Sequence, residues 1–347
     1  MKRIAAILGR SALAGIVLAV TFCAGGALLL GGAAWWIQRS DAGGDGGSFV
    51  ETFVAGVDDT NATKVVRVEI SGEIGPPAPS PVGDLIGGAL GAGDAGGVDA
   101  FNAARDRIHL ATDEKDVKGL YLVIDSPGGD LTDSDLLWHD VQLFREALPG
   151  RFVFVHALAQ CCSGGYYVAA AADFIMVVPT GEVGSIGVIS DYGFNVSDLA
   201  RRFGVSNMVV STGVNKDTLN PLKPVDPRQL AIEQGLIDSQ FARFVEIVAE
   251  GRKMDVEKVR ALADGRVYAA PDAKEKGLVD AVGYPDEALE ILDKLAGGKV
   301  HVIEYERSPE VEPSLIGKLF GGKTHVLHQR SARRRRGLPV PRLRLVR

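Results

Sequence analysis

The stretch from Ala159 to Tyr167, with the sequence AQCCSGGYY, constrains the fold of this chain more than any other. An apolar run, Phe152–Val155, precedes it, and a run of small residues, Val168–Ala172, follows it. The apolar run predicts a buried strand, and the small residues predict a helix with a closely packed face. Ser163 therefore falls on a sharp strand-to-helix turn, close to the free N–H groups of the first helical turn. A serine in this place is either a simple helix N-cap or a nucleophile.

Strands and helices alternate on both sides of this turn. The predicted order is strand, helix, strand, helix, strand, over residues 119–125, 132–148, 152–158, 164–172 and 174–178. Near-continuous apolar strands separated by helices predict an α/β fold with a largely parallel sheet that is covered on both faces. Further along, the pattern predicts another strand at 207–212 and a long amphipathic helix at 229–248.

Residues 11–37 form an almost unbroken run of apolar and small residues. The run exceeds the roughly 20 residues that a bilayer requires and is too long for the apolar core of a cleaved signal peptide, so it predicts an uncleaved transmembrane anchor. Lys2, Arg3 and Arg10 precede it, and only Arg39 follows closely. This bias places residues 1–10 in the cytoplasm and everything after residue 38 on the extracytoplasmic side of the cell membrane. The alternative is a buried core helix.

The remaining chain divides by composition into three segments. Residues 38–62 are rich in Gly and Asp and predict a polar linker, residues 63–300 hold the α/β domain, and residues 301–347 form a C-terminal extension. The last 18 positions of this extension carry eight arginines and no acidic residue, although the net charge of the whole chain is −6. The rest of the chain is therefore acidic, which argues against nucleic acid as a partner. The basic tail is either solvated or attracted to anionic lipid.

Residues 317–324, GKLFGGKT, match the phosphate-loop pattern letter for letter. That loop requires a buried strand before it and a helix after it inside an α/β sheet, whereas here Pro313 precedes it and the basic tail follows. The sequence therefore predicts no nucleotide site, and it predicts no cofactor or metal.

A nucleophilic serine requires a base, and the six histidines do not supply an obvious one. No histidine lies between Ser163 and residue 300, while His156 falls within a predicted strand and His139 within a predicted helix. A lysine base is a recognised alternative. Lys216 is the best candidate, because it lies in a Gly- and Pro-bounded loop; its pKa, ordinarily about 10.4, would have to be lowered by desolvation or nearby charge. A Cys162 nucleophile is the minor alternative.

Two glycine-rich segments follow neighbouring strands and flank Ser163. Asp125–Gly129, with the sequence DSPGG, ends one strand, and residues 181–188, with the sequence GEVGSIGV, follow another. Chemistry in parallel sheets gathers at the carboxyl ends of the strands, so the two segments predict one shared site with Ser163.

Together with Lys216-Asp217, Pro221 and the DGRVY sequence of residues 264–268, these motifs resemble the signal peptide peptidase A family. The resemblance implies a Clp/crotonase-like fold with repeated ββα units, preceded by one transmembrane helix. It implies that Ser163 is the nucleophile and Lys216 the general base. The N–H groups of Gly129 and Gly164 would form the oxyanion hole, with Gly128 as the alternative donor, and Ser185 would help to orient the lysine.

The resemblance also implies a function: a membrane-anchored serine endopeptidase that hydrolyses apolar peptides, remnants of cleaved signal peptides above all. Serine and lysine would meet across a subunit boundary, because the chain has one copy of each motif and resembles the short form that assembles into a homo-oligomeric ring. The adjacent Cys161 and Cys162 depart from the family's small residues and predict thiol-sensitive activity. Two other readings stay open, a crotonase-type acyl-CoA enzyme and a catalytically inactive membrane scaffold.

Overall fold

Strand β3 (Val117–Gly129) shows how the sequence builds the centre of the fold. Its successive side chains enter two different cores. Leu120 and Leu122 pack into the larger one, together with Ile108 of α3 (Gly96–Asp113). Tyr121 and Val123 pack into the smaller one. A strand that is buried on both faces does not alternate between apolar and polar residues, which explains its continuous apolar sequence.

This computed structural model describes residues 49–75 and 96–307. The described chain forms a nine-stranded sheet in the order β1-β9-β2-β3-β4-β5-β8, with β6 paired to β4 and β7 paired to β6. The strands not yet introduced are β1 (Phe49–Gly56), β2 (Thr63–Ile74), β4 (Phe152–Cys162), β5 (Phe174–Val177), β6 (Glu182–Gly184), β7 (Val267–Ala269), β8 (Ala281–Val282) and β9 (Val300–Arg307). Pairing is parallel along β9, β2, β3, β4, β5 and β8, and antiparallel between β6 and β7.

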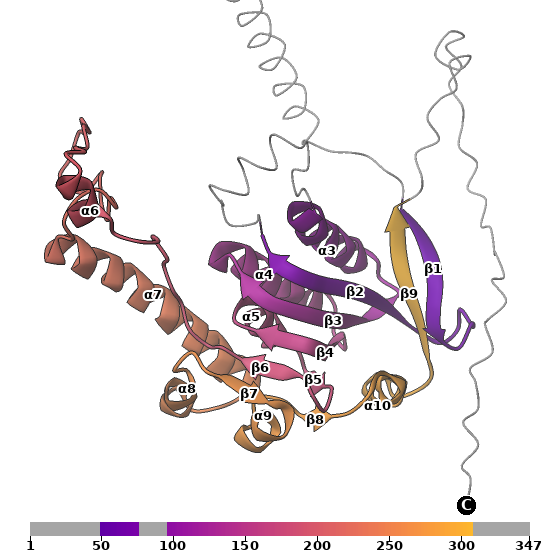
Figure 1. The fold of residues 1–347 in the computed structure, drawn as a ribbon. Coiled ribbons are helices and arrows are strands. Elements are labelled where there is room, and N and C mark those ends of the chain that lie inside the picture. Colours follow the sequence, from indigo (N-terminus) through magenta and orange to yellow (C-terminus); the bar gives the residue numbers. More distant parts are fainter. Residues whose placement is uncertain (1–48, 76–95, 308–347) are drawn as a thin grey trace, which may run out of the picture. The chain divides into compact units, whose positions relative to one another are not determined.

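Helices cover both faces of this sheet (Figure 1). The larger core lies under α3, α4 (Leu131–Ala147) and α5 (Gly164–Ala169), and the smaller core lies under α10 (Ala288–Ala296). The other helical segments are α6 (Ser197–Arg202), α7 (Pro227–Arg252), α8 (Val256–Leu262), α9 (Ala270–Lys276) and the 3-10 turn η1 (Pro285–Glu287). The predicted mixed α/β architecture is thus confirmed.

Two predictions about strands were wrong. Residues 207–212 form no strand, because they lie exposed without a neighbouring strand to pair with. Conversely, Phe49–Gly56, inside the predicted polar linker, forms β1 at one edge of the sheet. Phe53 of β1 stacks on His301 of β9, with ring centroids 5.2 Å apart, so an apolar contact holds this edge strand in place.

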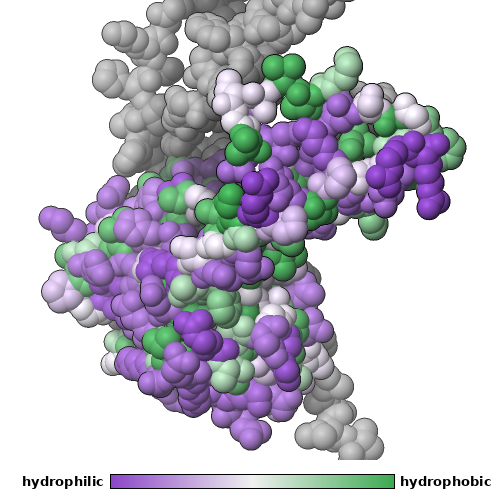
Figure 2. Space-filling view, turned by 90° about the vertical axis from the view of Figure 1, so that its left-hand side faces the viewer, coloured by the Kyte–Doolittle hydropathy of each residue, from purple (hydrophilic) through white to green (hydrophobic). Residues whose placement is uncertain are grey.

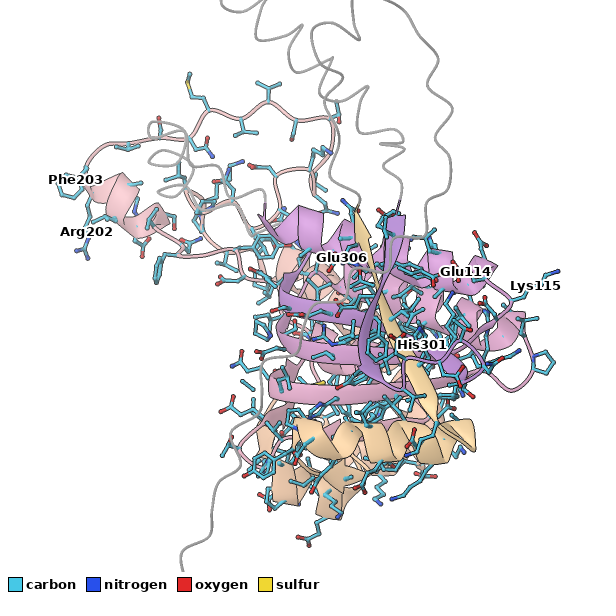
Figure 3. All side chains as sticks on the ribbon, turned by 90° about the vertical axis from the view of Figure 1, so that its right-hand side faces the viewer. Glu114, Lys115, Arg202, Phe203, His301 and Glu306 are labelled. Atoms are coloured by element: carbon cyan, nitrogen blue, oxygen red, sulfur yellow. The ribbon has the colours of Figure 1, made fainter. Side chains whose placement is uncertain are left out.

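Residues 187–243, here called the arm, contrast with the rest of the described chain, here called the body. The arm comprises a long connection, α6 and the first part of α7, and none of its residues is buried. Figure 1 shows α6 and the start of α7 away from the sheet, and Figure 3 shows Phe203 at the end of α6 pointing away from the body. The second part of α7 docks through its buried residues Phe244 to Ala249, and Phe241 and Arg243 at the end of the arm also contact the body.

The predicted transmembrane anchor at 11–37, the segment 1–10, most of the linker and the basic tail lie outside the described residues. Within residues 49–75 and 96–307, no helix combines the length and the apolar character that crossing a membrane requires. The predicted domain boundaries, including those at 63 and 300, stay predictions.

Candidate active site

Ser163 sits between the end of β4 and the start of α5, on the predicted strand-to-helix turn. Its backbone has φ 49° and ψ −120°, a region that residues with a Cβ rarely occupy. The N–H of Ser163 donates to the carbonyl of Gly184 at 2.8 Å, and its own carbonyl accepts from the N–H of Tyr167 at 2.9 Å. The turn is therefore held from both sides, by β6 and by α5. Strain of this kind persists only where the surroundings fix it.

The hydroxyl of Ser163 does not cap the helix that it precedes. The N-cap interpretation is therefore wrong. Among the described residues, no side chain hydrogen-bonds to this half-buried hydroxyl.

Gly128 approaches Ser163 so closely that only a glycine fits. Its φ is 110°, and an ideal Cβ built on it would lie 2.6 Å from the Cβ and 3.0 Å from the Oγ of Ser163. The next residue, Gly129, is equally confined, because a Cβ there would meet the backbone of Ile74 in β2. The DSPGG motif thus brings the end of β3 against the serine, as predicted from its place after a strand.

Helix α5 is locked in the core by its two tyrosines. Both side chains are fully buried; the hydroxyl of Tyr166 donates to the carbonyl of Leu278 at 2.7 Å, and that of Tyr167 donates to Asp135 at 2.5 Å. Gly164, the first residue of α5, is buried against Ser134 of α4. The N-terminal end of α5, including the N–H of Gly164, is therefore fixed next to the serine.

Ser185 ends up beside Ser163. Cys162 pairs with Gly184 across β4 and β6, so the two serines are the first residues after the ends of neighbouring parallel strands. Ser185 has the same unusual φ of 49°, and its N–H donates to the carbonyl of Arg266 at 2.8 Å. The DGRVY segment around β7 thus supports β6, which in turn holds the N–H of Ser163.

Lys216 does not join this cluster within one chain. It lies in a turn of the arm, where its N–H donates to the carbonyl of Gly213 at 3.2 Å and its side chain is exposed. Nearby in the same loop, Lys223 pairs with Asp217. The structure therefore assembles Ser163, the glycines and Ser185, and leaves the predicted lysine apart. The pairing expected across a subunit boundary stays a prediction.

The two cysteines are poor nucleophiles. Burial raises the pKa of the Cys162 thiol to about 11 and raises the pKa of the Cys161 thiol well above its ordinary value, so both are protonated at neutral pH. A thiolate, not a thiol, attacks carbonyl carbon. The Cys162 nucleophile is therefore disfavoured, and thiol-sensitive activity is no longer expected at neutral pH.

Neither His156 nor His139 is placed to act as a base for Ser163. His156 is 1% exposed, its Nδ1 lies 3.3 Å from the hydroxyl of Tyr121, and its ring stacks on Phe154 in the core under α10. Burial lowers the pKa of His156 to about 4, so it is neutral in the folded chain. His139 is exposed on α4. The expectation that the base is not a histidine stays a prediction.

The sequence analysis missed Ser126, the second residue of the DSPGG motif. Its side chain is fully buried, and it accepts a hydrogen bond from the N–H of Gly128 at 3.1 Å. The signal was present, because a serine in a turn often bonds to backbone groups two residues away.

A serine on a strained strand-to-helix turn, faced by glycines at the ends of neighbouring parallel strands, defines a class of α/β proteins that includes hydrolases. The model of peptidase family S49 matches residues 150–299, which contain the turn, β6, the arm and β7. Curated relatives extend this match. A candidate protease of Synechocystis sp. is 35% identical over 201 residues, which is 58% of this chain and 71% of that protein. The chain belongs to peptidase family S49.

Other relatives carry more specific names. A candidate signal peptide peptidase SppA of Enterococcus faecium is 37% identical over 183 residues, 52% of each chain. Protease 4 of Salmonella typhi is 31% identical over 233 residues, 66% of this chain and 36% of that protein. The matched part of this chain thus spans about half the length of the Enterococcus relative. These names support the resemblance to the signal peptide peptidase A family.

Proposed function

We propose that the chain is a serine endopeptidase whose nucleophile is Ser163. The observation that carries this proposal is the turn itself: a strained, half-buried serine that caps nothing, with Gly128 packed against its Cβ and Oγ. A substrate carbonyl placed over that hydroxyl would lie next to the backbone of the DSPGG loop and the first N–H of α5. Family membership supports the same chemistry.

In the proposed reaction, Ser163 Oγ attacks the peptide carbonyl while a base takes the hydroxyl proton. The carbonyl oxygen becomes an oxyanion that accepts hydrogen bonds from the N–H groups of Gly129 and Gly164. A backbone donor of this kind stabilises the transition state by about 3 kcal/mol. The amine product leaves with a proton, and water then hydrolyses the acyl-enzyme ester.

Lys216 is the proposed base, and it would come from a neighbouring subunit. Within one chain its ammonium group is exposed. Insertion next to Ser163 of a second copy would desolvate the amine and lower its pKa, which a general base requires. The exposed apolar side chains of the arm favour such an assembly, because they would be buried by another copy in a homo-oligomeric ring.

The proposed substrates are apolar peptides that remain near the membrane, such as cleaved signal peptides. The name of the Enterococcus relative supports this class. The predicted anchor at 11–37 would hold the domain at the extracytoplasmic side of the cell membrane, where such peptides are produced.

The test uses the full chain in detergent, a fluorophosphonate probe that labels activated serines, and an apolar fluorogenic peptide. Wild-type protein should be labelled and should cleave the peptide; Ser163→Ala should do neither, and Lys216→Ala should lose cleavage. Lys223→Ala is the matched control from the same loop, and it should retain activity. All variants should keep the oligomeric size of the wild type by light scattering.

Mixing Ser163→Ala with Lys216→Ala subunits tests the shared site. If each site joins a serine of one subunit to a lysine of the next, random co-assembly should restore about a quarter of wild-type activity. No recovery in co-assembled rings would place both residues in one subunit and contradict the shared site. A wild-type ring that is neither labelled nor active would instead support the inactive scaffold.

A further inference from the structure

The end of β3 is irregular, and side chains rather than a regular ladder hold it. β3 shifts register against β4 between Ile124 and Ser126, and β2 shifts against β3 between Ser71 and Glu73. Such bulges leave backbone groups without their usual partners. Asp125 fills one gap, because its Oδ1 accepts from the N–H of Gln160 at 3.0 Å. The DSPGG loop is thereby tied to the strand that leads to Ser163.

Ser126 fills the other gap. Its fully buried hydroxyl donates to the carbonyl of Gly72 in β2 at 2.6 Å and accepts from the N–H of Gly128 at 3.1 Å. Two residues after Gly128, a direct backbone hydrogen bond joins the strands again, because the N–H of Asp130 donates to the carbonyl of Ile74 at 2.8 Å. The hydroxyl thus takes the place of one rung between β2 and β3.

We propose that Ser126 is a positioning residue that selects Gly129, and not Gly128, as the oxyanion donor of the DSPGG loop. This inference rests on the proposed peptidase function. The N–H of Gly128 is occupied by Ser126 and the N–H of Asp130 by Ile74, so both are directed towards β2. In this proposal the N–H between them, that of Gly129, faces the other side, where β4 leads to Ser163.

Loss of the hydroxyl would leave the buried N–H of Gly128 unpaired and would also remove the partner of the carbonyl of Gly72, an exposed residue. They can recover a direct bond only if the Gly128 peptide moves towards β2, and that movement draws the following residue with it. Gly128 is already in contact with Ser163, so the serine and its oxyanion donor would shift relative to each other. The hydroxyl therefore acts on the rate of the chemical step rather than on substrate binding.

The experiment compares wild type with Ser126→Ala in the full chain, with active sites counted by the fluorophosphonate probe. We expect kcat per labelled site to fall about 30-fold with KM within about twofold, because a misplaced oxyanion donor acts only in the transition state. Hydrogen exchange at the amide of Gly128 should become faster. Thr112→Val is the control: it removes a hydroxyl that donates to the carbonyl of Ile108 in α3, and it should leave kcat unchanged.

Ser126→Cys is the second variant, in case the alanine variant does not fold. Its thiol keeps the volume but is a weak hydrogen-bond partner, so its kcat should lie between those of the other two proteins. A kcat per labelled site within about twofold of wild type, in whichever of these variants folds, would overturn the role of Ser126 and leave the peptidase proposal standing. An unlabelled, inactive wild type would overturn both.

Discussion

The body and the arm of this chain differ in how far they bury their apolar side chains. In the body, the central strands β3 and β4 are buried on both faces, and the larger core alone joins side chains from six helices and the sheet. In the arm, apolar side chains remain exposed instead; Phe194, Met208 and Val214 are each at least 87% exposed. Figure 2, viewed from the side of the arm, shows hydrophobic patches open to solvent.

The difference also divides the candidate active site. Ser163, its glycines and Ser185 belong to the body, where packing and backbone hydrogen bonds fix them in the single chain. Lys216 belongs to the arm, which has no core of its own. We infer that the body carries a preformed nucleophile and that the arm delivers the base only when another copy buries it. The following predictions test that division.

The largest effect should come from Arg151, which holds the body together at the opposite end from the serine. Its buried guanidinium stacks on Phe144 and donates to five backbone carbonyls, those of Ala111, Thr112, Glu114, Val117 and Phe144. Arg151→Met should lower the free energy of unfolding by about 4 kcal/mol, because these carbonyls lose their partner. Urea denaturation measures this. Arg202→Met, on exposed α6, should change it by less than about 0.5 kcal/mol; equal effects would contradict the division.

The second effect concerns pH and His156. This histidine is neutral when folded, with a pKa near 4, and ordinarily has a pKa of 6.5. Its contribution to the free energy of unfolding is therefore complete above pH 6.5. That contribution is lost as the pH falls towards 4, by about 3 kcal/mol in total. His156→Phe should remove this part of the pH dependence. Urea denaturation at pH 7 and pH 4.5 measures the difference, and an identical pH slope in both proteins would refute the buried neutral state.

The third effect separates assembly from folding. Leu230 and Leu236 of α7 are 52% and 56% exposed, so replacing both with Asp should leave the thermal unfolding of the body unchanged. If the arm binds another copy, the same change should give monomers by analytical ultracentrifugation and reduce peptide cleavage about 100-fold. Leu143→Asp, which replaces an exposed leucine on α4 of the body, is the matched control and should still assemble. A fully active monomer would show that the base lies in the same chain.

The smallest effect should come from Cys162. Its thiol is protonated at neutral pH, and its Sγ lies 3.7 Å from the carbonyl of Glu182, a weak contact. Cys162→Ala should therefore change peptide cleavage by no more than about twofold. Treatment of the wild type with iodoacetamide at pH 7 should likewise leave activity intact. Rapid inactivation that the alanine variant escapes would show that the thiol is accessible and that the body is looser around Ser163 than the structure indicates.

The sequence predicted the parts of the fold in which local pattern and burial agree. The strands and helices from β3 to β5 lie where their apolar runs place them, and Ser163 lies on the predicted turn. The DSPGG loop lies beside the serine, as its place at the end of a neighbouring strand predicted. These features depend on neighbouring residues, so a local pattern is sufficient to find them.

The errors came from segments whose state depends on distant partners. Val209 and Val210 look like strand residues, but a strand requires a neighbour, and residues 49–75 and 96–307 offer none there. Residues 49–56 follow a Gly- and Asp-rich stretch that hid their apolar character, and they form β1 because β9 pairs with them. The local bond of Ser126 to Gly128 could have been predicted, but its bond to Gly72 could not, because Gly72 is in another strand.

The order β1-β9-β2 places the last strand of the described chain between the first two. During synthesis, β1 and β2 emerge long before β9, so β1 has no partner until translation has passed residue 307. Truncation within β9 would therefore remove β1 from the sheet as well and expose an edge of β2. This side of the sheet can therefore be completed only late, after the chain has been synthesised through β9.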